Sequence, residues 1–492
     1  MRKRSMICLP KSTWGVLASL FLAAASSAGA SRSSVDATSR CPNVLFILTD
    51  QWRAQATGYA GDPNVRTPNL DTLAKEGLNF ETAVSVCAVC TPYRAALQTG
   101  RFPLSTGMYK NDLYLDPNEY CMAEIFKDAG YNTAYVGKWH LDGHGRSAYI
   151  PPERRQGYEY WKVLECTHNY ANSKYYDNND PEVKVWEGKY DGYAQTKDAQ
   201  AFIRRHAKDD KPFLFFLSFG GPHYTHKLSP KDLQKTYPPE SLKLRPNIQF
   251  TEDFTEAQLR KELQGYYAHC TAIDQCVGDL RATLDELGIA DNTILVFTSD
   301  HGEMMGSQGI KYFAKRHPYD EAIRVPFLLS YPKVTEGNAR KISTPINTPD
   351  ILPTLLSLAG IDIPDTIEGD DLSVLVKEPG REIDRAALTM QVDGTYGPDY
   401  RGIRTARYWY SEEPNAGRKL LFDCENDPYQ MNNLVDNPEY AELQEKMAAS
   451  LKAELIKVDD YPFADKTGYR QHLKRVSGVD RKGDRKKGKR KK

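Results

Sequence analysis

The stretch Asn43-Val44-Leu45-Phe46-Ile47-Leu48-Thr49 is apolar along almost its whole length and runs directly into the polar pair Asp50-Gln51. A short continuous apolar run of this kind is typical of a strand that is buried on both faces, as in a parallel sheet. Similar runs occur further along the chain at Thr133–Val136, Phe213–Phe219, Thr293–Thr298 and Val325–Tyr331. Together these runs predict the strands of one mainly parallel sheet.

Helical patterns fall between these runs. Thr67 followed by Pro68 is a typical helix start, because Thr serves as an N-cap and Pro fits the first turn. Predicted helices cover about 67–77, 122–130, 255–287 and 348–360. The alternation of strands and helices predicts an α/β fold: a large mixed, mostly parallel sheet sandwiched between helices.

The pattern changes after about residue 380. Short strands are predicted at Leu388–Val392, Gly402–Thr405, Tyr408–Tyr410 and Lys419–Asp423, with a helix from about Pro438 to Ile456. We therefore expect the main α/β domain at 41–380 and a smaller C-terminal α+β subdomain at 381–473. The last residues, 474–492, are expected to form a basic disordered tail.

Composition and charge exclude several classes of protein. The chain has 492 residues, of which 40% are hydrophobic and 26% charged, so disorder and collagen-like or coiled-coil structure are excluded as its main state. The net charge is zero, but it is +4 over 1–30 and +9 over 474–492, which leaves −13 for 31–473. An acidic body argues against a nucleic-acid-binding surface.

The N-terminus has the features of a signal peptide. Basic residues at 2–4 and 11 precede an apolar stretch at 14–25, and Ala28-Gly29-Ala30 fits a cleavage site. We therefore expect 1–30 to direct export to the periplasm or the medium, with no transmembrane segment in the mature chain. Eight cysteines remain beyond Cys8, and their spacing shows no dense disulfide framework.

Polar side chains follow four of the predicted strands. In an open α/β sheet, ligands bind beyond the carboxyl ends of the strands, so these side chains should converge. The segments that follow the strands are Asp50-Gln51, Gly137-Lys138-Trp139-His140, Gly220-Gly221-Pro222-His223 and Ser299-Asp300-His301-Gly302. A single strand-end His or Asp is more often structural, but the convergence of all four segments predicts a functional site.

The residue types at this edge suggest a metal and an anion. Asp50, Gln51, Asp300 and His301 could hold a divalent cation, and because three of them offer oxygen, Ca²⁺ or Mg²⁺ is favoured over zinc. Lys138 and Lys315 could neutralise a bound oxyanion. His140 and His223 have the intrinsic pKa suited to proton transfer near neutral pH.

The stretch Cys90-Thr91-Pro92-Tyr93-Arg94-Ala95-Ala96-Leu97-Gln98-Thr99-Gly100-Arg101 is the most specific signal. Pro92 suits the first turn of a helix, which would place Cys90 at a helix N-terminus that favours an anion. The stretch resembles the signature C-x-P-x-R of the type I sulfatases, closed by Thr-Gly-Arg, in the alkaline-phosphatase-like superfamily. The strand-end segments and Lys315 match the family's other motifs in the right order, over about residues 41 to 335.

Two positions depart from the common family pattern. Many members have two adjacent Asp residues where this chain has Asp50-Gln51, and many have Asn where this chain has His301. Both variants resemble known subgroups, so the metal site stays credible while its preference between Ca²⁺ and Mg²⁺ is open.

The resemblance implies a chemistry for these residues. A separate maturation enzyme would oxidise Cys90 to formylglycine, whose hydrated gem-diol attacks sulfur and forms a covalent sulfate–enzyme intermediate. Arg94 would orient the hydrated aldehyde, and Lys138 and Lys315 would bind the sulfuryl oxygens. By the same resemblance, His223 protonates the leaving alcohol and His140 assists the second hydroxyl, although these two roles could be exchanged. The metal would be held by Asp50, Gln51, Asp300 and His301, with the modified Cys90.

The substrate is expected to be a sulfated carbohydrate. The segment 144–176 is rich in His, Arg and aromatic residues that could contact a sugar, although an ordinary surface insertion would explain most of them individually. Arg146, His168 and Asn169 are the predicted substrate-binding residues.

Three other functions remain open from the sequence. One is hydrolysis of a phosphate or phosphonate ester within the same superfamily. Another is a catalytically silent glycan-binding protein that kept the fold. A third is a thiol oxidoreductase that uses Cys87 and Cys90, but the strand-end metal cluster would then be unexplained.

Overall fold

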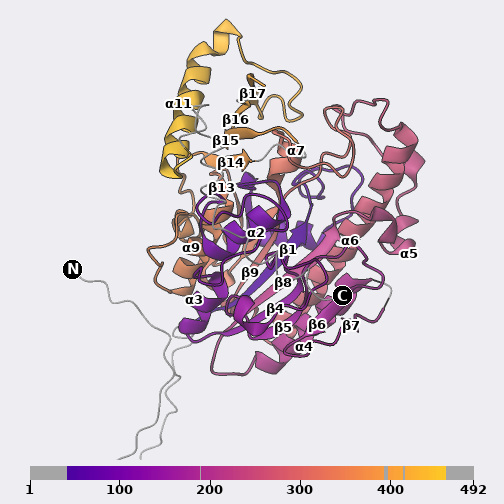
Figure 1. Cartoon of the computed structure of the whole chain (residues 1–492), viewed down its shortest axis with the longest axis vertical. Coiled ribbons are helices and arrows are strands. Elements are labelled where there is room, and N and C mark those ends of the chain that lie inside the picture. Colours follow the sequence, from indigo (N-terminus) through magenta and orange to yellow (C-terminus); the bar gives the residue numbers. More distant parts are fainter. Residues whose placement is uncertain (1–40, 189, 393–396, 414–415, 461–492) are drawn as a thin grey trace, which may run out of the picture.

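Strand β1 (Asn43–Asp50) lies at the centre of the main sheet (Figure 1). Its side chains alternate between two hydrophobic cores. Val44, Phe46 and Leu48 pack into the core on one face of the sheet. Leu45 and Ile47 pack into the core on the other face. The strand is therefore buried on both sides, which explains why its sequence is continuously apolar.

The computed structural model describes residues 41–188, 190–392, 397–413 and 416–460. The predicted signal peptide at 1–30 and the predicted tail at 474–492 lie outside these residues. Within the described ranges, ten strands form the main sheet. Their order is β12 (Arg340–Ile342), β2 (Leu78–Phe80), β11 (Phe327–Ser330), β9 (Thr293–Ser299), β1, β8 (Phe213–Pro222), β4 (Asn132–Lys138), β5 (Tyr160–Leu164), β6 (Lys174–Asp177) and β7 (Lys184–Val185).

The centre of the sheet is parallel and its edges are mixed. Strand β1 pairs in parallel with β8 and β9, and β4 pairs in parallel with β8 and β5. Strands β11 and β6 run antiparallel to their neighbours β9 and β5. The predicted fold class, a mixed and mostly parallel sheet between helices, is confirmed.

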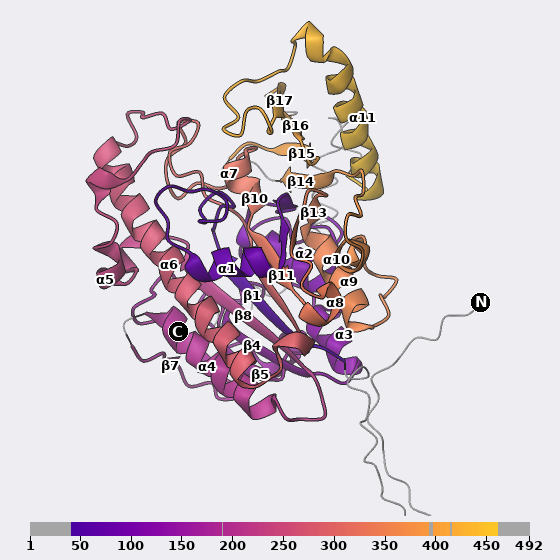
Figure 2. The same cartoon turned by 180° about the vertical axis from the view of Figure 1, so that it is seen from behind.

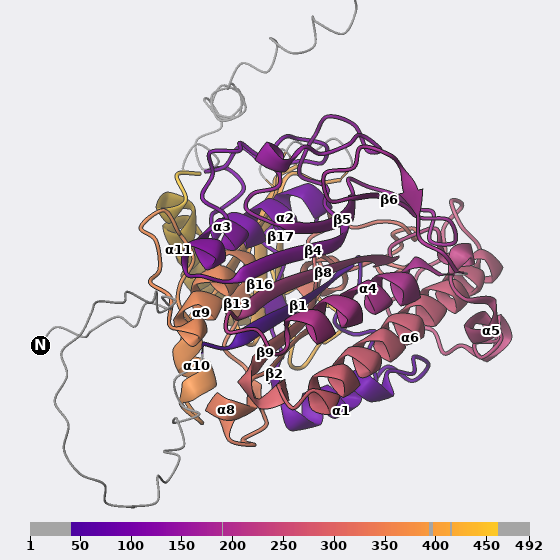
Figure 3. The same ribbon diagram turned by 90° about the horizontal axis from the view of Figure 1, so that it is seen from below.

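Helices cover both faces of the sheet, as Figures 2 and 3 show from behind and from below. On one face lie α1 (Pro68–Glu76), α4 (Asp191–His206) and α6 (Glu256–Glu286). On the other face lie α2 (Cys90–Thr99), α3 (Met122–Asp128), α9 (Thr348–Ala359) and α10 (Ser373–Lys377). Short helices in the connections are η2 (Pro152–Arg154), η3 (His226–Leu228), α5 (Lys231–Gln234), η4 (Pro239–Ser241), η5 (Ala290–Asn292), α7 (Asp320–Ile323) and α8 (Pro332–Thr335).

Two predicted elements differ in detail from the structure. The run at 325–331 is not one strand, because Pro326 cannot donate a ladder hydrogen bond and separates β10 (Arg324–Val325) from β11. Strand β10 instead joins β3 (Ala83–Val84) and β13 (Ile346–Asn347) in a small separate sheet. Helix α9 is capped by Asn347, one residue before the predicted start, through a capping box with Asp350.

A second sheet lies above the main one in Figure 1. Strands β14 (Ala387–Gln391), β15 (Tyr400–Arg404), β16 (Tyr408–Glu413) and β17 (Arg418–Asp423) are antiparallel, and η6 (Pro438–Tyr440) and α11 (Ala441–Lys457) follow them. Leu388 and Met390 pack in one cluster with Val86, Val89 and Ala96. This packing fixes β14 beside the N-terminus of α2.

Helices long and apolar enough to cross a membrane are absent from the described part of the chain.

Candidate functional site

The predicted site residues meet where the central parallel strands end. Asp50 is the last residue of β1 and Lys138 the last of β4. Asp300 follows β9 directly, and His223 follows β8 directly. The parallel register of β1 with β8 and β9, and of β4 with β8, brings these four ends to the same edge, as expected for an open α/β sheet.

Cys90 is the first residue of α2 and is 1% exposed. Its Sγ lies 3.3 Å from His301 Nε2, 3.2 Å from Lys315 Nζ and 3.6 Å from Asp50 Oδ1. Burial by itself would raise the pKa of the Cys90 thiol, but the positive charges of Lys138 and Lys315 lower it well below its usual value. The structure therefore places residue 90 where a negative charge is stabilised.

Arg94 lies one turn further along α2 and joins the two central carboxylates. Its Nη2 donates to Asp50 Oδ2 at 3.3 Å and to Asp300 Oδ2 at 3.2 Å. Its Nη1 donates to the Lys138 carbonyl at 3.0 Å and to Ser218 Oγ at 2.7 Å. The guanidinium is 2% exposed, so its hydrogen-bond donors hold the site together and fix the start of α2.

A group of buried donors fits a divalent cation. One donor atom from each of Asp50, Cys90, Asp300 and His301 lies within 4.8 Å of the others. His301 Nδ1 donates to the Gly302 carbonyl at 3.0 Å, which leaves the Nε2 lone pair facing Cys90. Two carboxylate groups with one imidazole suit a hard cation such as Ca²⁺ or Mg²⁺ better than zinc.

The two central carboxylates have different pKa values because their surroundings differ. Burial and the neighbouring Asp50 charge raise the pKa of Asp300 to about 6. Burial and the Cys90 thiolate also act to raise the pKa of Asp50, but the positive charges around it, led by Lys138, hold that pKa below its usual range. Lys138 Nζ donates directly to Asp50 Oδ2.

His140 and His223 approach Cys90 with opposite pKa shifts. Burial and Lys315 lower the pKa of His223 well below its usual value. Its Nδ1 donates to the Tyr224 carbonyl at 2.9 Å, and its Nε2 accepts from Lys315 Nζ at 3.1 Å. Burial acts to lower the pKa of His140 as well, but Cys166, followed by the hydrogen bonds to Asp112 and Cys90, raises it to about 9.

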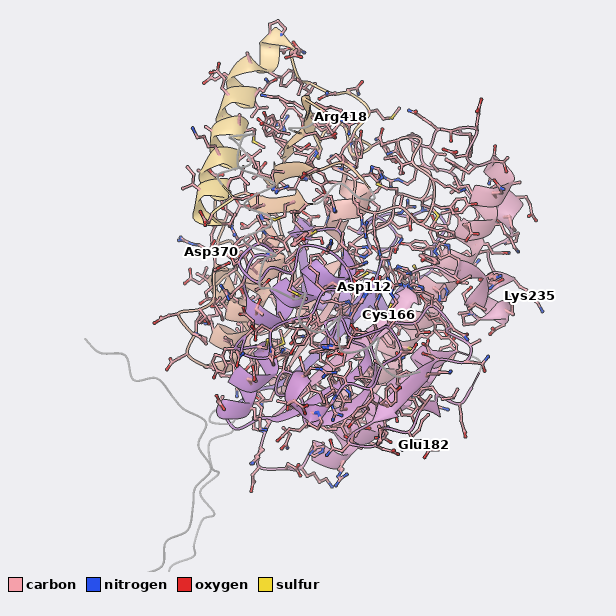
Figure 4. The ribbon with its side chains drawn as sticks, in the orientation of Figure 1. Asp112, Cys166, Glu182, Lys235, Asp370 and Arg418 are labelled. Atoms are coloured by element: carbon pink, nitrogen blue, oxygen red, sulfur yellow. The ribbon has the colours of Figure 1, made fainter. Side chains whose placement is uncertain are left out.

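A cavity of about 650 Å³ is lined by five of the predicted site residues, Cys90, Lys138, His140, His223 and Lys315. The cavity is lined by Val89, Cys90, Lys110, Asn111, Asp112, Lys138, His140, Arg146, His168, His223, Tyr224, Phe313, Ala314, Lys315, Arg316, Gln391 and Val392. Figure 4 shows Asp112 near the centre of the molecule, below the C-terminal sheet. Because Gln391 ends β14 and Val392 follows it, the C-terminal sheet contributes to the cavity wall.

The predicted substrate-binding residues lie in different surroundings. Arg146 and His168 line the cavity, whereas Asn169 is exposed and is not a lining residue. His168 stacks on His223 with ring centroids 4.4 Å apart. The Arg146 guanidinium donates two hydrogen bonds, of 3.0 and 2.9 Å, to the Asp112 carboxylate. The two residues therefore line the cavity as an ion pair. Trp161, from the same segment, is buried in the core.

Sequence reasoning missed three residues that shape the site. Asp112 holds His140 Nε2 at 3.1 Å, Ser218 holds Arg94, and Glu303 holds Gln51. Ser218 gave one usable signal, since a polar residue inside a buried strand needs a hydrogen-bond partner. Asp112 lies in a loop, and no motif or spacing marked it.

We expect Asp112→Asn to flatten the pH dependence of stability. The pKa of His140 is about 9 in the folded protein, against an ordinary 6.5, so the charged histidine stabilises the fold fully below pH 6.5. This contribution, about 3 kcal/mol at most, is lost as pH rises through 9. Denaturant unfolding at about pH 6.5, 7.5 and 9 should show that the free energy of unfolding falls less with rising pH in the variant than in the wild type.

Two features make this comparison specific. Asp112 has a φ of 62°, a backbone conformation that Asn also tolerates, so the substitution adds little strain. Asp116→Asn, on the same loop and exposed, serves as the control and should leave the pH dependence unchanged. An equal loss of stability in wild type and Asp112→Asn would show that this carboxylate does not stabilise charged His140.

Comparisons with known proteins agree with this fold. The sulfatase family model matches residues 42–361, and the model of the N-sulphoglucosamine sulphohydrolase C-terminal region matches residues 308–457. The chain is 54% identical over 423 residues to an ulvan-active sulfatase of Formosa agariphila, covering 85% of this chain and 82% of that protein. It is 30% identical to an endo-4-O-sulfatase of Bacteroides thetaiotaomicron, and the match covers 86% of this chain and 94% of that protein.

A solved structure from Bacteroides fragilis, described as a sulfatase, superposes with a TM-score of 0.79 at 31% identity, covering 86% of this chain and 97% of that one. The chain belongs to the sulfatase family, and it is a sulfuric ester hydrolase. The predicted resemblance is thereby confirmed.

Proposed function

We propose that this protein is an exported sulfatase that removes sulfate from an anionic carbohydrate, with Cys90 oxidised to formylglycine as its nucleophilic residue. The observation that carries this proposal is the position of Cys90: at a helix N-terminus, at the base of a cationic cavity, and within 3.3 Å of both His301 and Lys315. The export signal is inferred from residues 1–30 of the sequence alone.

The donor set described above fits a bound Ca²⁺, with Mg²⁺ as the alternative. Asp50, Asp300 and His301 would hold it together with residue 90, and Gln51 would add its side-chain oxygen. When bound, the cation and the oxidised residue 90 together supply a negatively polarised oxygen nucleophile for sulfur.

The other residues position the sulfate ester and move its protons. Lys138 and Lys315 reach the base of the cavity and would bind the sulfuryl oxygens, where negative charge must be stabilised during transfer. His223 Nε2 shares a hydrogen bond with Lys315 Nζ, so this pair can supply the proton that the leaving alcohol needs. His140, held by Asp112 through Nε2, keeps Nδ1 for proton transfer at residue 90.

The cavity lining favours an anionic saccharide. Lys110, Arg146 and Arg316 add to the two lysines at its base, and Asp112 is the single acidic side chain among the described lining residues apart from the cation site. Phe313 and Tyr224, with ring centroids 4.8 Å apart, offer apolar surface to a sugar face. The names of the two sequence relatives above, which refer to ulvan and to a 4-O-sulfate, support the same class.

The surroundings of Cys87 argue against the alternative function as a thiol oxidoreductase. Cys87 and Cys90 are both free thiols, and burial raises the pKa of Cys87 to about 12. A buried thiol that stays protonated is a poor partner for disulfide exchange.

The test is release of inorganic sulfate from a panel of sulfated saccharides, with phosphate release from matching phosphate esters measured in parallel. The protein is produced with and without a formylglycine-generating enzyme, and the mass of the peptide containing Cys90 reports its conversion. Sulfate release by the converted protein alone is the expected result.

Two other results would change the conclusion. Phosphate release without sulfate release would favour the ester-hydrolase alternative of the same superfamily. Converted protein that hydrolyses an aryl sulfate but no saccharide on the panel would overturn the carbohydrate substrate.

A further inference from the structure

Gln51 occupies the position where many sulfatases carry a second aspartate, and its side-chain amide is completely buried. The amide makes two contacts in opposite directions. Its Nε2 donates to Glu303 Oε2, and its Oε1 accepts from Lys315 Nζ at 3.2 Å. The orientation of this amide decides which of its atoms faces the cation site.

Glu303 fixes that orientation, because its carboxylate is fully buried and can only accept hydrogen bonds when ionised. Its Oε1 accepts from the backbone N–H of Met305 at 3.0 Å and of Ala314 at 3.2 Å. Its Oε2 is left for Gln51, so the nitrogen of the Gln51 amide must face Glu303. The oxygen of the amide must then point the opposite way.

The opposite side of the Gln51 amide is the cation site. Lys315 Nζ lies 3.2 Å from Gln51 Oε1 and 3.2 Å from Cys90 Sγ, so the amide oxygen and the nucleophilic residue share one neighbour. The backbone N–H of Gln51 also donates to Asp300 Oδ1 at 3.0 Å, which ties the residue to a second donor of the site.

We propose that Glu303 is a positioning residue for the metal. Glu303 holds the Gln51 amide so that the amide oxygen faces the cation. Glu303 also supplies a negative charge, which a second aspartate would place next to the cation and which here lies behind Gln51. Its bond to the backbone N–H of Ala314 also anchors the loop that carries Lys315. The inference rests on the proposed function, because it assumes that this cluster holds a divalent cation.

The exchange Glu303→Gln has a specific predicted consequence. The side-chain oxygen of the introduced amide must still accept from the backbone N–H groups of Met305 and Ala314, so its NH₂ group turns toward Gln51. Gln51 then has to flip and present its own NH₂ group to the cation site. A hydrogen-bond donor in place of an oxygen ligand should weaken Ca²⁺ binding at least about tenfold, the scale typical of lost metal support.

The isosteric swap Gln51→Glu with Glu303→Gln restores every contact. The amide now at position 303 accepts from the two backbone N–H groups and donates to the carboxylate now at position 51. The other oxygen of that carboxylate faces the cation, and the summed charge of the pair is unchanged. The double variant should therefore bind Ca²⁺ much as the wild type does.

Two further variants separate this pairing from a general effect of charge. Gln51→Glu alone leaves two buried carboxylates in contact, which should weaken Ca²⁺ binding and lower the melting temperature of the chelated protein. Glu321→Gln is the matched control, because Glu321 is a buried carboxylate that holds Arg245 and Asn247 instead.

The experiment is calorimetric titration of Ca²⁺ alone into the full chain with Cys90 unconverted, after removal of metal by a chelator. We expect Glu303→Gln to bind at least about tenfold more weakly, the swap to return within about threefold of wild type, and the control to bind like wild type. Should Glu303→Gln fail to fold, recovery of folding in the swap supports the same pairing.

Wild-type affinity in Glu303→Gln, a swap that binds no better than the single variants, or a wild type that binds neither Ca²⁺ nor Mg²⁺ would overturn the inference. The measurement is independent of turnover. Sulfate release with unaltered Ca²⁺ binding in Glu303→Gln would contradict the pairing alone. The expected binding pattern without sulfate release from any ester would contradict the proposed function alone.

Discussion

Replacing Cys90 with alanine is expected to lower sulfate release by at least about 10⁴-fold, the scale seen when a catalytic nucleophile is removed. Under the proposed function, the Cys90 side chain at the start of α2 is the group that is oxidised to the nucleophile, and its Sγ lies 3.2 Å from Lys315 Nζ and 3.3 Å from His301 Nε2. Folding should survive, because the change removes one buried atom. The measurement is the initial rate of sulfate release at saturating substrate, with unfolding followed separately.

Cys87→Ala provides a matched control for this prediction. Cys87 is also completely buried and lies three residues before Cys90, so its substitution leaves a similar small cavity. It packs with the C-terminal sheet and does not line the catalytic cavity, so turnover should stay within about threefold of wild type. Equal loss of activity in both variants would mean that the reaction needs both cysteines.

Arg94→Ala is expected to cost about 3–5 kcal/mol of unfolding free energy in the chelated protein, as when one partner of a buried ion pair is removed. The variant leaves the Asp50 and Asp300 carboxylates close together without the Arg94 guanidinium that pairs with both. Added Ca²⁺ should recover part of the loss, because a divalent ion neutralises the same carboxylates. Sulfate release should fall with stability, since the start of α2 is no longer held. Denaturant unfolding with and without Ca²⁺ measures both effects.

Arg94→Lys tests whether charge alone is enough. Lysine keeps the positive charge but lacks the planar fork that reaches both carboxylates, so it should restore only part of the stability. Arg404→Ala is the control, because Arg404 is a similarly buried partner of Asp320 outside the catalytic cavity. It should lose similar stability while keeping turnover below its melting temperature. Loss of turnover in the control as large as in Arg94→Ala would make the effect of Arg94 purely structural.

The central fold could be predicted because short stretches of sequence directly reflect the burial of each strand and the start of each helix. Strands β1, β8 and β9 are buried on both faces and therefore continuously apolar, and helix α6 carries a capping box at Thr255. Helix α4 gave no clear pattern, because polar side chains such as Gln195 and Thr196 occupy part of its buried face. Strands of two or three residues, such as β3 and β13, are too short to show any periodicity.

The site could be predicted to the extent that it lies at strand ends. Asp50, Lys138 and Asp300 converge because parallel strands bring their carboxyl ends together, whatever fills the sequence between them. Asp112 could not be found in this way, because its place beside His140 depends on the path of a loop. Trp161 is one of the aromatic residues of the segment 144–176 that could have contacted a sugar, but it is buried, with the Arg155 guanidinium 5.3 Å from the centre of its ring.

The site residues lie far apart in the sequence, and this separation determines how long Cys90 stays accessible during synthesis of the chain. Cys90 and His301 are in contact although 211 residues separate them. At roughly 5–20 residues per second, synthesis of that stretch takes about 10 to 40 s, during which Cys90 is already made but its cavity cannot close. In the finished fold this side chain is 1% exposed. Under the proposed function, an enzyme that oxidises Cys90 would therefore meet an accessible thiol in the growing or newly released chain, and the rate of folding afterwards would limit how many molecules it could still convert.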